Sequence, residues 1–377
     1  MPLLDEISAL PADLKKTLSD RGFDHELFAK LAELHSKSDG NRVEGTVERV
    51  VPSDLETLAT PGTPKHAEWT RAGERYFREG KVALVVMAGG MATRMGGVVK
   101  VLVDVFDDTS FLDLRIAENA AFERKFGKKM PLWLMTSAPT EAPIRDALKK
   151  ANAPAHITTF EQGLGLRLDE RGSIFKESNG VASTCATGHG DLVDALRRSL
   201  FLKKFVEDGG EYVFISNVDN LGATPDPAIL GALLESKKRV LVEVVKKEAG
   251  DRGGIPVRWN GKAQILEEFR LPETFDPNTV DVFNTNTFLV EAKALLEAEI
   301  DWTWFKVTKK VEGKNVVQFE RLVQEIAAVL PSMFLVVPRD GDDPRFLPVK
   351  DNDELARRRE TLETLATKRG WIPGRAP

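Results

Sequence analysis

The sequence predicts an α/β protein whose central sheet is doubly wound and flanked by helices. The apolar run Val82–Met87 leads directly into a glycine-rich loop, which is typical of a buried parallel strand. From Val82 onward, apolar strand-like runs alternate with helical patterns, as they do in doubly wound sheets. The 377 residues are enough for a large core and an appended lobe.

The N-terminal segment, residues 1–78, differs from the rest and is expected to be helical. Apolar residues recur at helical spacing from Leu27 to Leu34. Breaker residues then set the expected limits: helices interrupted at Pro11 and Gly22, a polar linking loop over residues 40–64, and a helix over 66–78.

The main domain is expected to cover residues 79–350, and strands alternate with helices in its first half, 79–250. The expected strands are 82–87, 132–136, 156–160, 212–216 and 239–246. The expected helices are 111–125, 191–205, 226–236 and one that Thr140 caps, with Pro143 in its first turn.

The second half, residues 251–350, is less regular. Strands are expected near 255–258, 264–268 and 283–289. A charged helix over 352–368 lies in the closing segment, residues 351–377.

Composition excludes several classes of protein. The formal net charge is −5 and no stretch is strongly basic, so we expect no nucleic-acid partner. No apolar run reaches about 18 residues, so we expect no membrane span, and the amino terminus lacks the pattern of a signal peptide. Cys185 is the only cysteine, which points to a reducing compartment and a cytoplasmic protein. Its place beside a glycine-rich motif permits a reactive thiol, but a small buried residue is the preferred interpretation.

The glycine-rich loop after Met87 predicts phosphate or nucleotide binding. Gly89 and Gly90 let backbone N–H groups approach a phosphate, and Arg94 and Lys100 could offset its charge. Neither GxxxxGK[ST] nor GxGxxG is present, so a P-loop NTPase and an NAD-type site both lose support.

This loop and seven later motifs resemble the eukaryotic-type UTP–glucose-1-phosphate uridylyltransferase (UDP-glucose pyrophosphorylase) family over roughly residues 75–355. Residues 73–90 are also similar to the related UDP-N-acetylhexosamine pyrophosphorylases. The later motifs are TFEQ (159–162), TGHGD (187–191), YVFISNVDNLGA (212–223), RGG (252–254), FNTNTF (283–288), NVVQFE (315–320) and RFLPVK (345–350). The resemblance implies a Rossmann-like, GT-A-like nucleotidyltransferase fold with a mixed sheet. The C-terminal β-helix of the glucose enzymes is expected to be absent, because few residues follow Lys350.

The resemblance also implies a set of site residues. Mg²⁺ would bind at Asp219, although an Asp after a strand can instead cap its own turn. The phosphates would meet Arg94, Lys100 and Lys350, with Lys247 a further candidate, although most lysines are simply solvated. The nucleotide would contact Ala88, Gly89, Gly90, Met135, Gln162 and Gly188, where Met135 could equally be a core residue. The sugar and its phosphate would contact His189, Gly190, Asn217, Gly254, Glu267, Asn284 and Asn286. Trp302 and Trp304 are interpreted as packing residues, and the FNTNTF amides could also be surface groups.

Three residues depart from the family pattern at the phosphate loop and beside the metal. Ala92 stands for a glycine, which would cost roughly 1 kcal/mol if that position needs positive φ. Val99 stands for a proline in a loop that is one residue short, and Val218 for a serine. We therefore expect a Mg²⁺-dependent uridylyltransferase acting on UTP and glucose 1-phosphate as a monomer or weak dimer. The alternatives are a pyrophosphorylase for another UDP-sugar, such as UDP-N-acetylglucosamine or UDP-galactose, and a non-catalytic binder of UTP or UDP-sugars.

Overall fold

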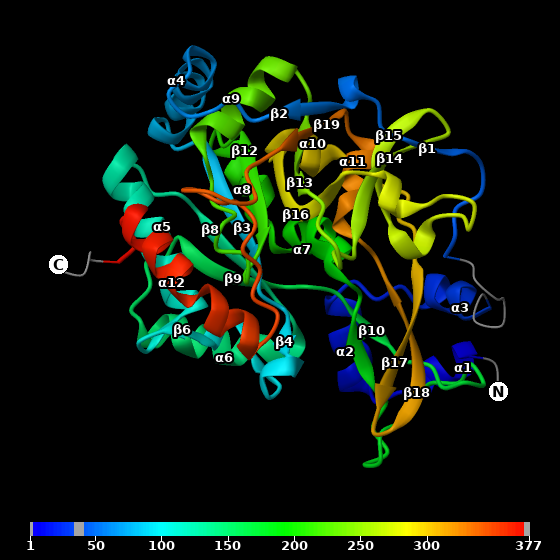
Figure 1. Ribbon diagram of the computed structural model, residues 1–377. Helices are drawn as coiled ribbons and strands as arrows, with labels where there is room; N and C mark the ends of the chain where they lie inside the picture. Colours follow the sequence, from blue (N-terminus) through cyan, green and yellow to red (C-terminus); the bar gives the residue numbers. More distant parts are fainter. Residues whose placement is uncertain (1–2, 34–40, 373–377) are drawn as a thin grey trace.

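The computed structural model describes residues 3–33 and 41–372. An eight-stranded sheet forms the centre of the molecule (Figure 1), and strand β16 runs antiparallel to both of its neighbours while the other pairs are parallel. This mixed sheet confirms the predicted fold class. In spatial order the strands are β2 (Leu55–Thr57), β19 (Ser332–Val336), β13 (Val240–Lys246), β16 (Val282–Glu291), β12 (Tyr212–Asn217), β3 (Val82–Met87), β8 (Leu132–Thr136) and β9 (Ile157–Glu161).

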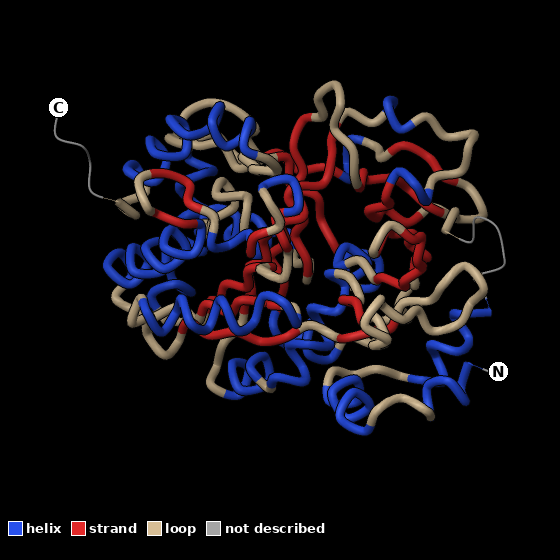
Figure 2. The backbone as a smooth tube through the Cα atoms, turned by 90° about the horizontal axis from the view of Figure 1, so that it is seen from below, coloured by secondary structure: helices blue, strands red, loops and turns tan. Residues whose placement is uncertain are grey.

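Helices cover both faces of this sheet, as Figure 2 shows with helices in blue around the red strands. On one face, Phe77 of α4 (Pro64–Arg78) lies 5.0 Å from Phe126 of α5 (Phe111–Phe126) and 6.3 Å from Phe214 of β12, centroid to centroid. Helix α9 (Pro227–Ser236) packs along α4. On the other face, Trp133 of β8 contacts Phe205 of α8 (Phe201–Glu207) at 5.6 Å. Neighbouring residues on a strand point to opposite faces, so the all-apolar strands are buried on both sides.

The remaining strands lie outside the central sheet. Most of them form a second lobe beside it, while the two short hairpins within residues 91–99 and 104–110 lie apart from that lobe (Figure 1). Strands β1 (Val47–Arg49), β14 (Gly254–Trp259) and β15 (Lys262–Glu267) form a three-stranded sheet. The other pairs are hairpins or arms: β10 (Leu164–Leu166) with β11 (Thr184–Ala186), β17 (Phe305–Val311) with β18 (Lys314–Glu320), β4 (Met91–Ala92) with β5 (Val98–Val99), and β6 (Asp104–Phe106) with β7 (Thr109–Ser110). The short helices α10 (Ala292–Glu297) and α11 (Ile326–Val329) lie between them in sequence.

The three N-terminal helices form a core of their own with two of these arms. In Figure 1 the blue helices α1 (Leu3–Ser8), α2 (Ala12–Asp20) and α3 (His25–Glu33) lie beside β10 and the orange hairpin β17–β18. Their buried residues, such as Leu18 and Phe28, join Leu164, Leu166 and Phe319 in a cluster separate from the main core. The predicted interruptions at Pro11 and Gly22 are confirmed, while Leu34 lies outside the described residues.

Most predicted elements are confirmed, including α12 (Asn352–Lys368), but three predictions were wrong. Residues 40–64 are not only a loop, because they contain β1 and β2. The helix predicted over 191–205 is two helices, α7 (Leu192–Ser199) and α8, since Leu200 adopts φ +63 between them. Helix α6 (Ala138–Lys150) is capped by Ser137 rather than Thr140, which moves Pro143 into its second turn. None of the helices within the described ranges is long and apolar enough to cross a membrane.

Candidate functional site

The predicted nucleotide and metal residues gather where four parallel strands end. Strands β3, β8, β9 and β12 are adjacent and parallel. Ala88, Ser137, Gln162 and Val218 are the first residues after them. Ligands of doubly wound sheets bind at this carboxyl edge, so the location agrees with a binding site.

The glycine-rich loop folds into the small β4–β5 hairpin. Met91 pairs with Val99, and the amide of Lys100 donates to the carbonyl of Gly90 at 3.1 Å. Ala92 has φ −75 and is buried, so the strain expected from replacing a glycine there does not occur. The left-handed turn is made instead by Gly96 at φ +89 and Gly97 at φ +75, where glycine is favoured.

Gly89 and Gln162 meet at the start of this loop. A Cβ on Gly89 would lie 2.6 Å from Nε2 of Gln162, so only glycine lets the two segments approach this closely. The hydroxyl of Ser137 donates to the carbonyl of Gly89 at 2.7 Å. The Gln162 side chain is 7% exposed and its amide has no hydrogen-bond partner within the described chain. An amide can donate and accept at once, which suits the edge of a base.

Lys100 and Asp219 form an ion pair across the loops that follow β3 and β12. Nζ of Lys100 lies 2.5 Å from Oδ2 of Asp219, and both side chains are more than four-fifths buried. The segment that carries Lys350 runs alongside, because the amide of Val349 donates to the carbonyl of Asp219 at 3.2 Å. Lys350 itself is exposed. The shortened loop therefore still delivers Lys100 to the predicted metal ligand.

Asp251 is a carboxylate whose pKa is affected by the charge of Lys350. Burial raises the pKa of Asp251, but hydrogen bonds from Arg339 and Glu248 and the charge of Lys350 outweigh it and lower the pKa overall. Asp251 lies in the loop that follows β13, at the same sheet edge as Asp219.

The TGHG loop is built against the segment that follows β18. Gly188 has φ +83, and a Cβ there would lie 2.5 Å from the carbonyl oxygen of Arg321. The amide of Gly190 donates to that same carbonyl at 2.9 Å. Burial lowers the pKa of His189 to about 4, and its Nδ1 accepts from the amide of Val323 at 3.1 Å. The neutral ring therefore carries its proton on Nε2 and presents a donor rather than a base.

A buried ionic cluster, Asp191 with Arg198, Arg321 and Asp194, holds this loop in place. Asp191 binds Arg321, accepts from Arg198 at 2.7 Å, and also accepts from the amide of Gly163. The guanidinium of Arg321 reaches Asp194 at 2.5 Å and lies 4.6 Å from the ring centroid of Trp304. Asp191 therefore joins the residue after Gln162 to the TGHG loop.

A bulge in β16 brings the predicted sugar residues together. Glu243 pairs with Thr287 while the next residue of β13 pairs with Asn284, so β16 has extra residues at this point. Within the bulge Asn286 adopts φ +59, and its Nδ2 donates to Oδ1 of Asn217 at 3.2 Å.

Gly254 and Glu267 lie next to the same bulge. A Cβ on Gly254 would lie 3.1 Å from Oε1 of Glu267 and 3.5 Å from Nδ2 of Asn284. Nε2 of Gln324 donates to Oε1 of Glu267 at 2.7 Å. Burial raises the pKa of Glu267 to about 7, although the Gln324 hydrogen bond opposes the rise.

Five of the residues discussed from the sequence lie apart from these groups. Lys247 pairs with Glu268 at 3.0 Å, and Arg94 is exposed without a partner in the described chain. Met135 is 2% exposed and packs in the core, like Ala88. Cys185 is buried, which raises the pKa of its thiol to about 12, so the interpretation as a small buried residue is confirmed.

Sequence reasoning missed Ser137, Asp191, Arg321 and Gln324. Ser137 follows a strand and begins a helix with Pro139 in its first turn, which is a recognisable cap signal. Gln324 gives no such signal, because its partner Glu267 lies 57 residues away in sequence.

The family model and the curated relatives that match this chain carry the same description. A family model described as UTP–glucose-1-phosphate uridylyltransferase matches residues 27–369. The UTP–glucose-1-phosphate uridylyltransferase of Musa acuminata is 32% identical over 326 residues, which cover 82% of this chain and 67% of that protein. With other curated relatives the covered share falls to 64% and 57% of their length, so the chain spans about two thirds of these relatives or less.

Solved structures with a similar fold include enzymes for two sugars. A UDP-glucose phosphorylase of Trypanosoma brucei gives a TM-score of 0.73 at 22% identity, covering 95% of this chain and 78% of that one. A uridine diphosphate N-acetylglucosamine pyrophosphorylase of the same organism gives 0.75 at 18% identity, covering 94% and 81%. This likeness establishes the fold alone.

Proposed function

The chain belongs to the UTP–glucose-1-phosphate uridylyltransferase family, and from that premise we propose that it makes UDP-glucose from UTP and glucose 1-phosphate. An oxygen of the sugar phosphate attacks the α-phosphorus of UTP, the bond to the β-phosphate breaks, and pyrophosphate leaves. Such a transfer depends on positioning and charge neutralisation. The pairing of Lys100 with Asp219 at the carboxyl edge, beside the segment of Lys350, carries this proposal.

The proposal assigns Mg²⁺ to Asp219. No three His, Cys, Asp or Glu side chains gather into a metal site within the described ranges. A single carboxylate still fits Mg²⁺, which binds one or two carboxylates together with substrate phosphates. When bound, the ion offsets charge on the phosphates. Asp219 offers that carboxylate, and Lys100 and Lys350 supply the remaining positive charge.

The other groups divide the recognition of the two substrates. Gln162, Gly89 and Gly188 face the uracil, where the free amide of Gln162 can pair with the ring edge. His189 donates from Nε2 to a phosphate or hydroxyl oxygen. For the sugar, the proposed ligands are Gly190, Asn217, Gly254, Glu267, Asn284 and Asn286.

The second candidate is the same reaction with another sugar 1-phosphate, because the fold also matches an N-acetylglucosamine enzyme. A non-catalytic binding protein has less support, since the suspected strain at Ala92 is absent. Pyrophosphate release from UTP and Mg²⁺ should be compared for glucose, N-acetylglucosamine and galactose 1-phosphates. We expect release that depends on glucose 1-phosphate. If only a different sugar 1-phosphate supports release, that sugar replaces glucose as the proposed substrate. If none of the three supports release although UTP binds measurably, the enzyme proposal is contradicted.

A further inference from the structure

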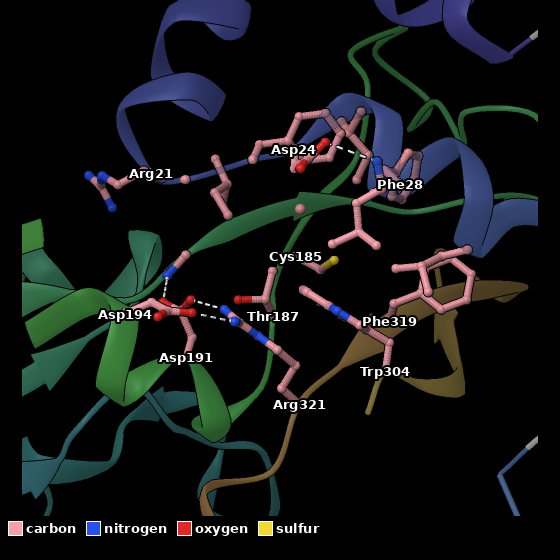
Figure 3. A pocket seen from close by; sticks show the side chains of 18 of the residues that line it. Arg21, Asp24, Phe28, Cys185, Thr187, Asp191, Asp194, Trp304, Phe319 and Arg321 are labelled. Atoms are coloured by element: carbon pink, nitrogen blue, oxygen red, sulfur yellow. Dashed lines mark hydrogen bonds and ion pairs between the residues drawn. The ribbon is translucent and has the colours of Figure 1, made fainter. Parts of the chain in front are cut away.

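A cavity of about 300 Å³ lies behind the TGHG loop, on the side of the N-terminal helices. Figure 3 shows its wall, with Phe28 above, Trp304 and Phe319 to one side, and Thr187 below. Leu31 of α3 and Leu166 of β10 also belong to the apolar part of the wall. Small-molecule pockets begin at about this volume.

The charged groups on the cavity wall are already paired within the protein. Three aspartates and three arginines line it, so their formal charges cancel. Asp191, Asp194, Arg198 and Arg321 form the ionic cluster described above, and Asp24 accepts from the amide of Leu27 at 2.9 Å. Arg21 forms an ion pair with Glu161. An anionic guest would therefore find no free guanidinium on the wall, so the cavity favours a neutral guest over an anion.

Two polar atoms of the wall residues lack a partner. The hydroxyl of Thr187 and Nε of Arg321 are buried and make no hydrogen bond within the described chain. An apolar cavity of about 150 Å³ takes benzene, so twice that volume has room for two fused rings. A ring system that carries one N–H or O–H group would also satisfy the Thr187 hydroxyl.

We propose that this cavity is a second small-molecule site, which takes a neutral, two-ring aromatic compound bearing one hydrogen-bonding group. Thr187 and Gly163 belong to its wall and are bonded directly to Gly188 and Gln162. Occupancy therefore alters the apparent affinity for UTP without competing for its site. This coupling rests on the proposed function, whereas the binding does not.

Indole is the test probe, with titration calorimetry of the whole chain as the readout. Two variants fill the cavity: Gly165→Leu, where an added Cβ would meet Thr187 and Cys185 at 3.4 and 3.6 Å, and Leu31→Trp. Val181→Leu, at an exposed position off the cavity wall, is the matched control. Thermal melting checks that each variant is folded.

We expect indole to bind the wild type and the Val181→Leu variant equally, and both filled variants at least 10-fold more weakly. The anion indole-3-carboxylate should bind at least 10-fold more weakly than indole. Saturating indole should change KM for UTP, while UTP should not displace it. Absent binding, equal binding to the filled variants, or displacement by UTP would overturn the site. An unchanged KM for UTP in an active enzyme would overturn the coupling. If the protein shows no turnover, calorimetry alone still tests whether indole binds. Failure of the proposed function can therefore be distinguished from failure of the cavity proposal.

Discussion

Glu267 illustrates how burial can shift the pKa of a proposed sugar ligand. Burial raises its pKa to about 7, Glu268 adds to the rise, and Gln324 and Arg270 oppose it. Near neutral pH the carboxyl is therefore divided between its two forms. Only the ionised form accepts hydrogen bonds with both oxygens, so the capacity of this proposed sugar ligand to hold hydroxyl groups would change across the physiological range.

We predict that kcat/KM for the sugar 1-phosphate rises with pH through an inflection near 7, and that Glu267→Gln removes it. KM for UTP should show no such inflection, which provides the internal control.

The free energy of unfolding should change with pH in the opposite direction to kcat/KM. The folded chain keeps a proton that the unfolded chain has lost above about 4.5, so the free energy of unfolding falls as pH rises through that window. A pH profile that Glu267→Gln leaves unchanged would contradict the assignment.

Lys350 provides a second test at the residue scale. Lys350→Ala should raise KM for UTP roughly 10- to 100-fold, because a charged hydrogen bond contributes about 1.5–3 kcal/mol. Binding of uridine, which lacks phosphates, should change little. Lys128→Ala, another exposed lysine just after helix α5, is the control. Equal losses for UTP and uridine, measured by calorimetry, would count against a phosphate role.

At the scale of elements, the geometry of the loop between β3 and β5 determines whether Ala92, which stands where the family has glycine, strains the backbone. Its turn is made by Gly96 and Gly97, and Ala92 before them has φ −75 and ψ 69, so its φ lies outside the left-handed region. The loop is also closed by backbone hydrogen bonds, including one from the amide of Lys100. The hairpin geometry therefore fixes Lys100 without a glycine at residue 92.

Restoring the glycine should consequently bring no gain. We predict that Ala92→Gly lowers the free energy of unfolding by roughly 0.5–1 kcal/mol, through the added freedom of the unfolded chain. Turnover should stay within about two-fold of the wild type. Denaturant unfolding and the pyrophosphate assay check this, and a large increase in kcat would show that Ala92 strains the loop after all.

Elements with a strong internal pattern were predictable from the sequence, and those defined by distant partners were not. Strand β3 and helix α12 follow from their own residues. Strand β2 has three residues and exists because Leu55 pairs with Phe334, which no local pattern reveals. The FNTNTF motif reads as a regular strand, and its bulge appears only in the register against β13. The same limit hid Gln324, whose role depends on a contact with β15.

At the scale of the whole molecule, one ionic cluster links the main sheet to the second lobe. Asp191 stands at the entry to α7, and Arg321 follows β18 in the second lobe. The domain limits 1–78, 79–350 and 351–377 remain a proposal. The N-terminal segment packs against both the second lobe and the central sheet, because α1–α3 belong to the smaller core and α4 packs on the sheet.

Breaking this cluster should therefore affect stability and nucleotide binding together. Removing one partner of a buried ion pair leaves an uncompensated charge, which costs about 3–5 kcal/mol. We predict such a loss for Arg321→Met in denaturant unfolding, with weaker UTP binding in the folded protein. Arg359→Met, which removes an exposed pair with Asp107, should cost less than about 1 kcal/mol. Equal losses for the two variants would contradict the role of the cluster.

The central claim is that Asp219 supports a metal-dependent transfer at the carboxyl edge of the sheet. The most direct measurement compares Mg²⁺-dependent pyrophosphate release from UTP and glucose 1-phosphate in the wild type, Asp219→Asn and Asp104→Asn, an exposed control. We predict that all three proteins stay folded at the assay temperature, with a lower melting temperature for Asp219→Asn because Lys100 loses its buried partner. We also predict a loss of at least about 100-fold in kcat for Asp219→Asn alone, and a wild-type rate for the control. A rate close to wild type in Asp219→Asn would contradict the account.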